Sequence, residues 1–369
     1  MKIRCQKSDI VKGVSIVSKA VPSKTTMPIL ECILIDATTN IIKLTANDME
    51  LGIETVIEGE IDQKGMVAID ARIFSDIVRK LPDNEVVIET DSNYQTLIKC
   101  EKAKFNISAK PGDDFSYLPY IERDEPIILS QFTLKEVIRQ TIFSIADNDS
   151  NKLMSGELFE INENSLKVVS LDGHRISIRN IELKNSYPLR KVVVPGKTLI
   201  EVSKILSGEA DRDVSLYFTN NHIVFEFDNT VVVSRLIEGE YFKIAQMLSN
   251  DFETKVRVNK KELLSCIDRA TLLVKEGDKK PIIINIQDGN MALKIKSQLG
   301  TMDEDIMIEK DGKDLLIGFN PKFLIDALRV IDDEEVDLYF MNAKAPCIIR
   351  DGEESYIYLI LPVNFSSVA

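Results

Sequence analysis

Apolar residues recur at helical spacing in three stretches that lie 125 residues apart. Each stretch shows an apolar stripe at i, i+3 and i+7, then an acidic turn, then alternating apolar and polar residues typical of a strand. The stretches cover residues 72–90, 197–218 and 321–340. Three sets of apolar positions are in step across them: Phe74, Leu199 and Leu324; Ile77, Val202 and Ala327; Leu81, Leu206 and Ile331. Agreement at three positions over such distances indicates an internal repeat.

A second helical pattern opens each repeat, at residues 8–20, 133–146 and 259–273, with Ser8, Thr133 and Asn259 as predicted N-caps. Strand-like stretches lie between the two helices of each repeat, and Asn and Gly at their breaks predict hairpins. Each repeat therefore reads as two β–α–β–β–β halves. The expected fold is α+β, with helices on one side of antiparallel sheets. The three predicted domains are 1–125, 126–250 and 251–369.

Composition places the chain among folded soluble proteins, since 44% of its 369 residues are apolar and 28% are charged. No apolar run approaches the ~18 residues of a membrane span, and the first residues carry no secretion signal, so a cytoplasmic protein is expected. The five cysteines are far apart and form no CxxC pair. This spacing favours reduced, buried thiols over disulfides or zinc, and no cofactor or metal is expected.

The net charge of −13 argues against a protein that coats nucleic acid with its whole surface. The six predicted helices nevertheless hold 15 basic and 7 acidic residues, a balance of +8, which leaves −21 for the rest of the chain. Solvated polar faces explain any single helix, but all six are net positive. A basic helical side in a chain without Trp favours contact with the phosphate backbone over stacking on bases.

The motifs "TTMPIL" (25–30), "DGHR" (172–175), "GFNPKFLIDAL" (318–328) and "YIYLILPV" (356–363) resemble those of the bacterial β sliding clamp family, the processivity subunits of the replicative DNA polymerase. The resemblance runs the full length of the chain. It implies a head-to-tail homodimer whose six domains form a ring, with helices lining a hole for duplex DNA and sheets outside. Such a protein is not an enzyme.

The resemblance also implies contacts for particular residues. Across the dimer interface, Phe105 and Ile107 would pack against Leu272 and Leu273, although strand alternation and helical spacing also allow all four to be ordinary core residues. Basic residues that match DNA-contacting positions of the family are Lys24, Lys152 and Lys197. The charge count adds Arg72, Arg79 and Lys80.

Partner proteins are implied as well, namely the replicative polymerase, the clamp loader and repair proteins, which dock short peptide motifs between the second and third domains. The matching apolar pocket comprises Met154, Leu171, Gly173, His174, Arg175, Ile176, Phe242, Met247, Asn320, Phe323, Pro346, Leu361 and Val363. Arg175 would hold an acidic or backbone oxygen. Phe242, Leu171 and Lys344 depart from the residues common in the family, which affects the expected peptide preference.

Two other functions remain open on the sequence. An enzyme would need a catalytic constellation, and the chain offers only Asp172 beside His174, without any established catalytic motif. Residues i and i+2 of a turn rarely point at each other, and Asp172-Gly173 reads better as a turn between two strands. A scaffold that binds only proteins is the other alternative, and the basic helices argue against it.

Overall fold

The fold is described from a computed structural model that covers residues 1–147, 151–248, 251–274 and 280–365. The chain divides into two compact units. The first comprises residues 1–134 and 200–236, and the second comprises residues 135–199 and 237–369. The division passes through two helices, α3 (Gln131–Thr141) and α4 (Gly196–Ile205). The predicted domain boundary at 125 lies in the first unit, and the one at 250 falls outside the described residues.

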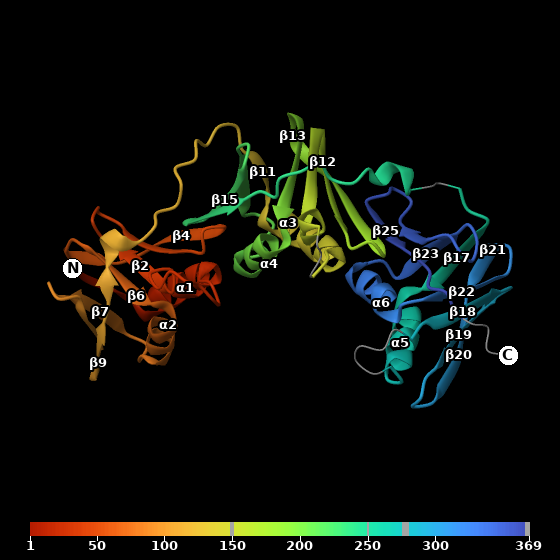
Figure 1. Ribbon diagram of the computed structural model, residues 1–369, viewed down its shortest axis with the longest axis horizontal. Helices are drawn as coiled ribbons and strands as arrows, with labels where there is room; N and C mark the ends of the chain where they lie inside the picture. The colour runs from red at the N-terminus through yellow and green to blue at the C-terminus, as the bar shows by residue number, and fades with distance from the viewer. Residues whose placement is uncertain (148–150, 249–250, 275–279, 366–369) are drawn as a thin grey trace. The chain divides into compact units, whose positions relative to one another are not determined.

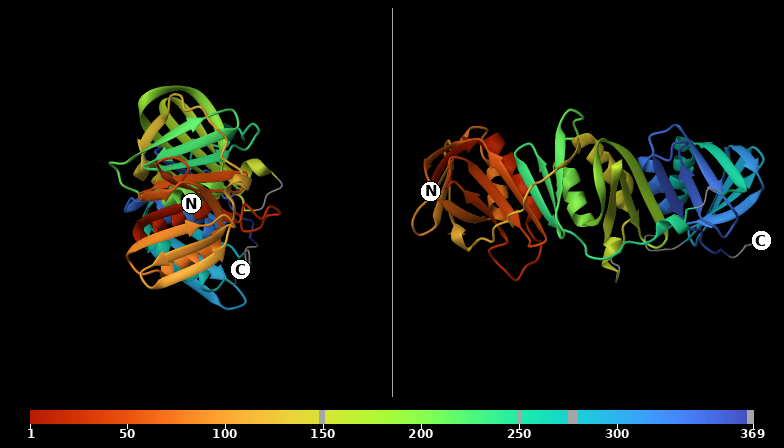
Figure 2. Two further views of the ribbon diagram at one scale, coloured as in Figure 1. Left: turned by 90° about the vertical axis from the view of Figure 1, so that its left-hand side faces the viewer. Right: turned by 90° about the horizontal axis from the view of Figure 1, so that it is seen from above.

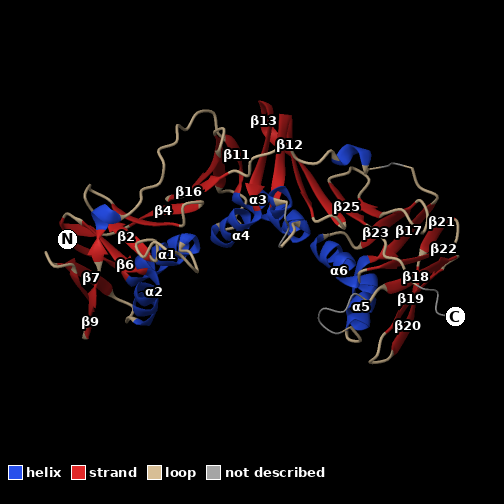
Figure 3. Ribbon diagram, viewed as in Figure 1, coloured by secondary structure: helices blue, strands red, loops and turns tan. Residues whose placement is uncertain are grey.

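The first unit holds α1 (Lys7–Val17) and α2 (Ala71–Lys80) side by side with two antiparallel sheets (Figures 1 and 3). The five-stranded sheet has the order β5 (Glu60–Gln63), β1 (Lys2–Gln6), β7 (Glu85–Thr90), β8 (Gln95–Cys100) and β9 (Ala103–Ser108). The nine-stranded sheet has the order β10 (Lys110–Pro111), β6 (Met66–Asp70), β2 (Cys32–Asp36), β3 (Ile42–Asn47), β4 (Leu51–Ile57), β16 (Thr230–Arg235), β15 (His222–Phe227), β14 (Asp213–Phe218) and β11 (Ile127–Ser130).

The second unit repeats this plan with α5 (Lys260–Thr271) and α6 (Pro321–Val330) side by side. Its seven-stranded sheet has the order β12 (Gly156–Leu171), β13 (Arg175–Pro195), β25 (Tyr356–Ile360), β24 (Cys347–Arg350), β23 (Glu335–Phe340), β17 (Thr254–Asn259) and β21 (Glu309–Gly312). Its four-stranded sheet has the order β20 (Thr301–Met307), β19 (Asn290–Lys296), β18 (Ile282–Gln287) and β22 (Leu315–Phe319). The long β12–β13 hairpin lies where the first repeat has the five strands β2–β6.

The element order confirms the predicted α+β fold. The first and third repeats have a strand, a helix, five strands, a helix and three strands, whereas the second has only the long strands β12 and β13 between its two helices. Strands of successive repeats also join into common sheets. β4 of the first repeat pairs with β16 of the second, with Thr55 opposite Thr230. β13 of the second repeat pairs with β25 of the third, with Ser177 opposite Tyr358. Each repeat is therefore tied to the next by the edge of a strand.

The predicted helical stripes are buried, because Phe74, Leu199 and Leu324 are each at most 3% exposed. Two of the three predicted N-caps are wrong. Ser8 lies inside α1, and the Ser130 hydroxyl accepts the backbone N–H of Thr133, so α3 begins two residues before Thr133. The Asn259 cap is confirmed, since its side chain accepts the N–H of Glu262. Nearby Ser or Asn residues compete for this role, and spacing alone does not choose among them.

All five cysteines are buried and free. Within the described ranges, no helix is long and apolar enough to cross a membrane. The same part of the chain contains no group of three or more His, Cys, Asp or Glu side chains arranged to hold a metal ion.

The buried stripe of α2 gives a test of the first unit's core. Phe74 is fully buried, whereas its neighbour Ile73 is half exposed. Phe74→Ala should lower the free energy of unfolding by about 3–5 kcal/mol, because it removes transfer free energy and leaves a cavity. The matched Ile73→Ala should cost less than about 1 kcal/mol. Urea denaturation measures both, and equal losses would contradict the assigned helix face.

Candidate functional site

The segment 171–176 is the turn of the β12–β13 hairpin. The Asp172 carboxylate accepts the backbone N–H groups of His174 (3.0 Å) and Arg175 (3.1 Å), and Gly173 has a left-handed backbone with φ of 82°. This geometry confirms the predicted turn. The other oxygen of Asp172 accepts from the Arg175 guanidinium (3.0 Å), so the carboxylate is committed to the turn and to Arg175.

Arg175 is a structural centre of the second unit, with only 8% of its surface exposed. Its guanidinium donates to Asp172, to Asp326 of α6 (2.7 Å) and to the Phe143 carbonyl, and it lies over the Phe323 ring at 4.5 Å. These contacts engage three of the five guanidinium N–H groups and fix the hairpin against α6. That Arg175 also holds an oxygen of a bound peptide stays a prediction.

Four predicted pocket residues belong to one apolar cluster. Leu171 and Ile176 are buried in it, and Met154 and Phe242 pack against it. Phe242 also meets Tyr241 edge to face, with ring centroids 5.5 Å apart. The cluster thus joins the hairpin to the segment that follows β16. Met247, in the same segment, is 52% exposed and lies outside the cluster.

Residues of the third repeat lie beside the exposed end of this hairpin. The His174 ring stacks on Phe323, with centroids 6.1 Å apart and an interplanar angle of 22°. The Leu361 N–H donates to the His174 carbonyl (2.9 Å), while the Leu361 side chain is 37% exposed.

The remaining predicted residues have mainly structural contacts. The Val363 N–H donates to the Gly318 carbonyl (2.9 Å), and Asn320 caps α6 by accepting the N–H of Lys322 (3.0 Å). Pro346 and the exposed Lys344 lie in the turn before β24. The structure therefore brings the hairpin, Phe242, Phe323 and Leu361 to one region. It supplies no such link for Met247 or Pro346.

We name the surface formed by Met154, His174, Phe242, Phe323 and Leu361 the hairpin surface. These side chains are partly or largely exposed apolar or aromatic groups above the buried cluster. Such a surface can receive apolar side chains of another molecule.

Glu157 is an uncompensated carboxyl group inside the second unit, and no sequence pattern predicted its burial. It is fully buried on β12, and neither of its carboxyl oxygens has a hydrogen-bond partner among the described residues. Burial in an apolar region disfavours the charged form, which raises the pKa of Glu157 to about 8. The neutral acid is therefore the stable form at neutral pH.

The predicted DNA-contacting basic residues are all exposed. The helices differ in whether their basic side chains form ion pairs. Arg72, Arg79 and Lys80 on α2 form no ion pair within the described part of the chain. Helices of the later repeats are partly neutralised: Arg139 pairs with Glu136 (2.6 Å), Arg269 with Glu304, and Arg329 with Asp268 (3.1 Å). Lys24 lies in the loop before β2, Lys152 begins a short 3-10 helix before β12, and Lys197 is the second residue of α4. The charge count could not reveal this difference, since it ignores pairing.

The four predicted interface residues lie at the surface. Phe105 is 38% exposed and Leu272 is 77% exposed, so the reading of all four as core residues is wrong. Ile107 is half-buried on β9, an edge strand, and Leu273 packs partly on the core of the third repeat.

Comparisons with known families match the chain in three consecutive parts. Residues 1–119 match the N-terminal domain of the DNA polymerase III beta subunit, residues 128–243 its central domain and residues 245–364 its C-terminal domain. The beta sliding clamp of Staphylococcus epidermidis is 34% identical over 359 residues, and that of Staphylococcus aureus is 35% identical over 357 residues. Each alignment covers 94% of both chains.

Solved structures agree. A DNA polymerase III beta subunit from Eubacterium rectale is 73% identical, with a TM-score of 0.96 over 99% of this chain and 100% of the other. The DNA polymerase sliding clamp of Bacillus subtilis is 34% identical, with a TM-score of 0.94 over the same shares.

The buried carboxyl group predicts a pH dependence of stability. Between pH 4.5 and about 8, the unfolded chain has lost the Glu157 proton while the folded chain keeps it. This group alone should then lower the free energy of unfolding by about 1.4 kcal/mol per pH unit, with no contribution below that window and no further change above it. Glu157→Gln should remove this slope and gain stability relative to the parent as pH rises. The exposed Glu240→Gln is the control, and parallel pH profiles for Glu157→Gln and the parent in urea denaturation would refute the assignment.

Proposed function

The chain belongs to the family of bacterial DNA polymerase III beta subunits, the β sliding clamps, and from this premise we propose that two copies close head to tail into a ring around duplex DNA. The ring holds the replicative polymerase and other DNA-processing proteins at their template. Its role is tethering, not catalysis.

The pairing of strands between repeats carries this proposal. β4, β13 and β20 occupy the same place in the three repeats, each as the second strand of a hairpin whose last paired residues enclose four residues. β16 and β25 likewise correspond to β9. β4 pairs with β16 and β13 pairs with β25, whereas β20 and β9 are sheet edges. β20 of one copy is therefore complementary to β9 of a second copy.

The same register as in the two internal joints would bring Asp303 opposite the partner's Lys104 and Met302 opposite the partner's Phe105 in the proposed third joint. The charges agree, because β9 carries Lys104 and no acidic residue, whereas β20 carries three acidic residues and no basic one. The apolar side agrees too, since Met302 and Leu273 both pack on the core of the third repeat and would receive Phe105.

The unpaired cations of α2, together with Lys7, Lys12 and Lys19 of the adjoining helix and turn, supply a basic side for DNA. Exposed lysine and arginine side chains bind phosphates without reading sequence, and such contacts weaken with salt. Retention by encirclement needs no tight contact. A weak, smooth interaction lets the ring slide.

We further propose that the hairpin surface receives short extended peptides from the polymerase, the clamp loader and repair proteins. Its partly exposed apolar and aromatic side chains suit apolar anchors, and Met154 adapts to varied shapes. The buried Arg175 holds the two walls, the hairpin and α6, at a fixed spacing.

A charge exchange tests the head-to-tail joint. Lys104→Asp and Asp303→Lys should each weaken the dimer several-fold, because each places like charges opposite one another. The double variant should recover most of the lost affinity. Sedimentation gives the dissociation constants, and Lys64→Asp, in the exposed turn between β5 and β6, controls for net charge. No recovery in the double variant would contradict the register.

The apolar contact of the same joint links assembly to DNA retention. Phe105→Ala with Leu273→Ala should produce folded monomers that leave circular DNA as fast as linear DNA. The parent should stay on nicked circular DNA and leave linear DNA through its ends. If the parent leaves both at the same rate, encirclement is wrong, and the chain is better described as a scaffold that binds only proteins.

A matched pair of leucines tests the hairpin surface. Leu361→Asp should weaken binding of a labelled peptide carrying the replicative polymerase's clamp-binding motif by tenfold or more, about 1.4 kcal/mol, because a carboxylate would enter an apolar contact. Leu316→Asp is the control, since Leu316 has similar exposure and lies on β22. Fluorescence anisotropy measures both, and equal affinities would exclude Leu361 from the site.

A further inference from the structure

The segment from Phe115 to Pro126, which we call the connector, crosses the outer face of the nine-stranded sheet as a long loop (Figures 1 and 2). Three contacts pin its first half. Phe115 is buried against the sheet, the Asn47 amide donates to the Ser116 carbonyl (3.3 Å), and Leu118 sits directly over Gly52. A Cβ at Gly52 would lie 2.0 Å from the end of the Leu118 side chain, so a larger residue there would displace Leu118. At the far end Arg123 pairs with Glu226 (3.0 Å).

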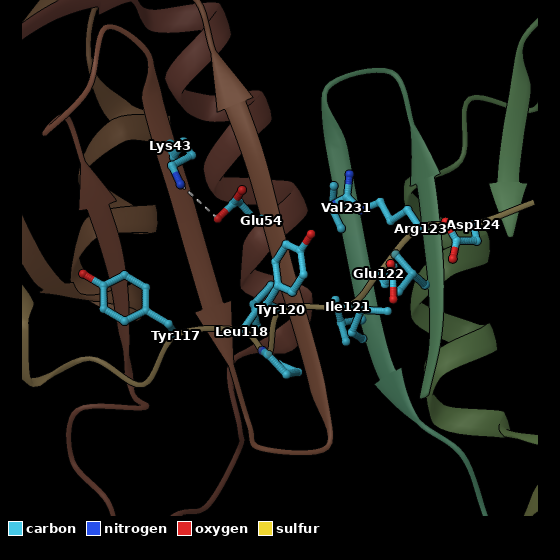
Figure 4. Close-up of a pocket in the computed structure, with 13 residues that line it drawn as sticks. Lys43, Glu54, Tyr117, Leu118, Tyr120, Ile121, Glu122, Arg123, Asp124 and Val231 are labelled. Carbon is cyan, nitrogen blue, oxygen red and sulfur yellow. Dashed lines mark hydrogen bonds and ion pairs between the residues drawn. The ribbon is translucent and has the colours of Figure 1, made fainter. Parts of the chain in front are cut away.

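An open groove of about 780 Å³ lies between the connector and the sheet, next to Lys43 and Glu54 on one side and Val231 on the other (Figure 4). Val224 and Val233 complete its apolar floor. A second hollow of about 280 Å³ shares Leu118, Pro119 and Val233 with it. Clefts of roughly 300–1,000 Å³ are the size at which proteins bind ligands.

The connector offers unused backbone groups to this groove. From Tyr117 to Asp124, none of its backbone N–H or C=O groups makes a hydrogen bond within the described part of the chain. The segment forms no helix or strand there. An extended peptide laid alongside could pair with these groups in the manner of an added strand.

The exposed side chains of the connector define the chemistry of such a peptide. Tyr120 is 96% exposed and Tyr117 57% exposed, which is unusual for large aromatic residues. Glu122 and Asp124 are exposed carboxylates without an ion pair among the described residues, whereas Lys43 is already paired with Glu54 (3.5 Å). The valine floor can therefore contact apolar side chains, and Glu122 and Asp124 leave unpaired negative charge at one end of the groove.

We propose that this groove docks an extended peptide segment of another protein, with apolar residues over the valine floor and basic residues beside Glu122 and Asp124. The site lies entirely in the first unit and is separate from the hairpin surface. It would give the chain a second place to hold a partner. Neither the ring nor the hairpin surface is needed for it.

Methyl NMR of the full chain, labelled at Ile, Leu and Val, tests the proposal with two synthetic peptides. One has the sequence Gly-Val-Ile-Val-Lys-Lys-Gly, and the other carries Glu in place of both lysines; both have blocked ends. We expect the lysine peptide to cause saturable shifts of the Val224, Val231 and Ile121 methyl signals at concentrations up to about 1 mM. The glutamate peptide should cause none.

Variants give the second readout. Glu122→Lys with Asp124→Lys should weaken binding about fivefold, the effect of two exposed ion pairs, and Tyr120→Ser should weaken it as well. Glu238→Lys with Glu240→Lys, the same charge change after β16, and Leu189→Ser on β13 should leave the affinity unchanged. The proposal is overturned by an absence of saturable shifts, by shifts confined to Ile176 and its neighbours, by equal binding of both peptides, or by full affinity in the Glu122 and Asp124 variant.

Discussion

Everything in this fold depends on how the edges of its strands are paired. Backbone N–H and C=O groups at a sheet edge are strong hydrogen-bonding groups and must find partners or stay in water. Here the edge of each repeat is covered by the next: β4 by β16, and β13 by β25. A chain of three such repeats necessarily ends with one edge of each type, β9 and β20. In the proposed ring, the same pairing rule would join two chains, and assembly would need no interface of a new kind.

The sequence predicted the elements well because burial follows from spacing. Phe74, Leu199 and Leu324 are apolar, in step and buried, and the α+β fold follows from them. Helix starts were harder. Ser130 and Thr133 are both good caps three residues apart, and only the backbone conformation decides which oxygen faces the free N–H groups. The unusual length of β12 and β13 could not be predicted either. Polar residues within them look like turns in the sequence, and only the pairing of the two strands shows that each strand continues.

The candidate site was predicted only in part. Leu171, Ile176 and Phe242 were found from a family resemblance and do share one cluster. The structural contacts of Arg175 could not be predicted, because its sequence neighbours include Asp172 but not Asp326, which is 151 residues away. Glu157 gave no signal at all. A glutamate on a strand is normally exposed, and only the tertiary packing of the second unit buries this one.

The distribution of charge connects the parts of the proposed function. A net charge of −13 would repel DNA from most of the surface, and ion pairs such as Arg329–Asp268 neutralise much of the helical cation count. What stays unpaired is concentrated on α2 and on the helix and turn beside it. Because a closed ring retains DNA by topology, a small basic area suffices to keep the duplex centred, and strong binding would only slow its movement. At the proposed groove, the unpaired carboxylates of Glu122 and Asp124 would receive basic partner segments.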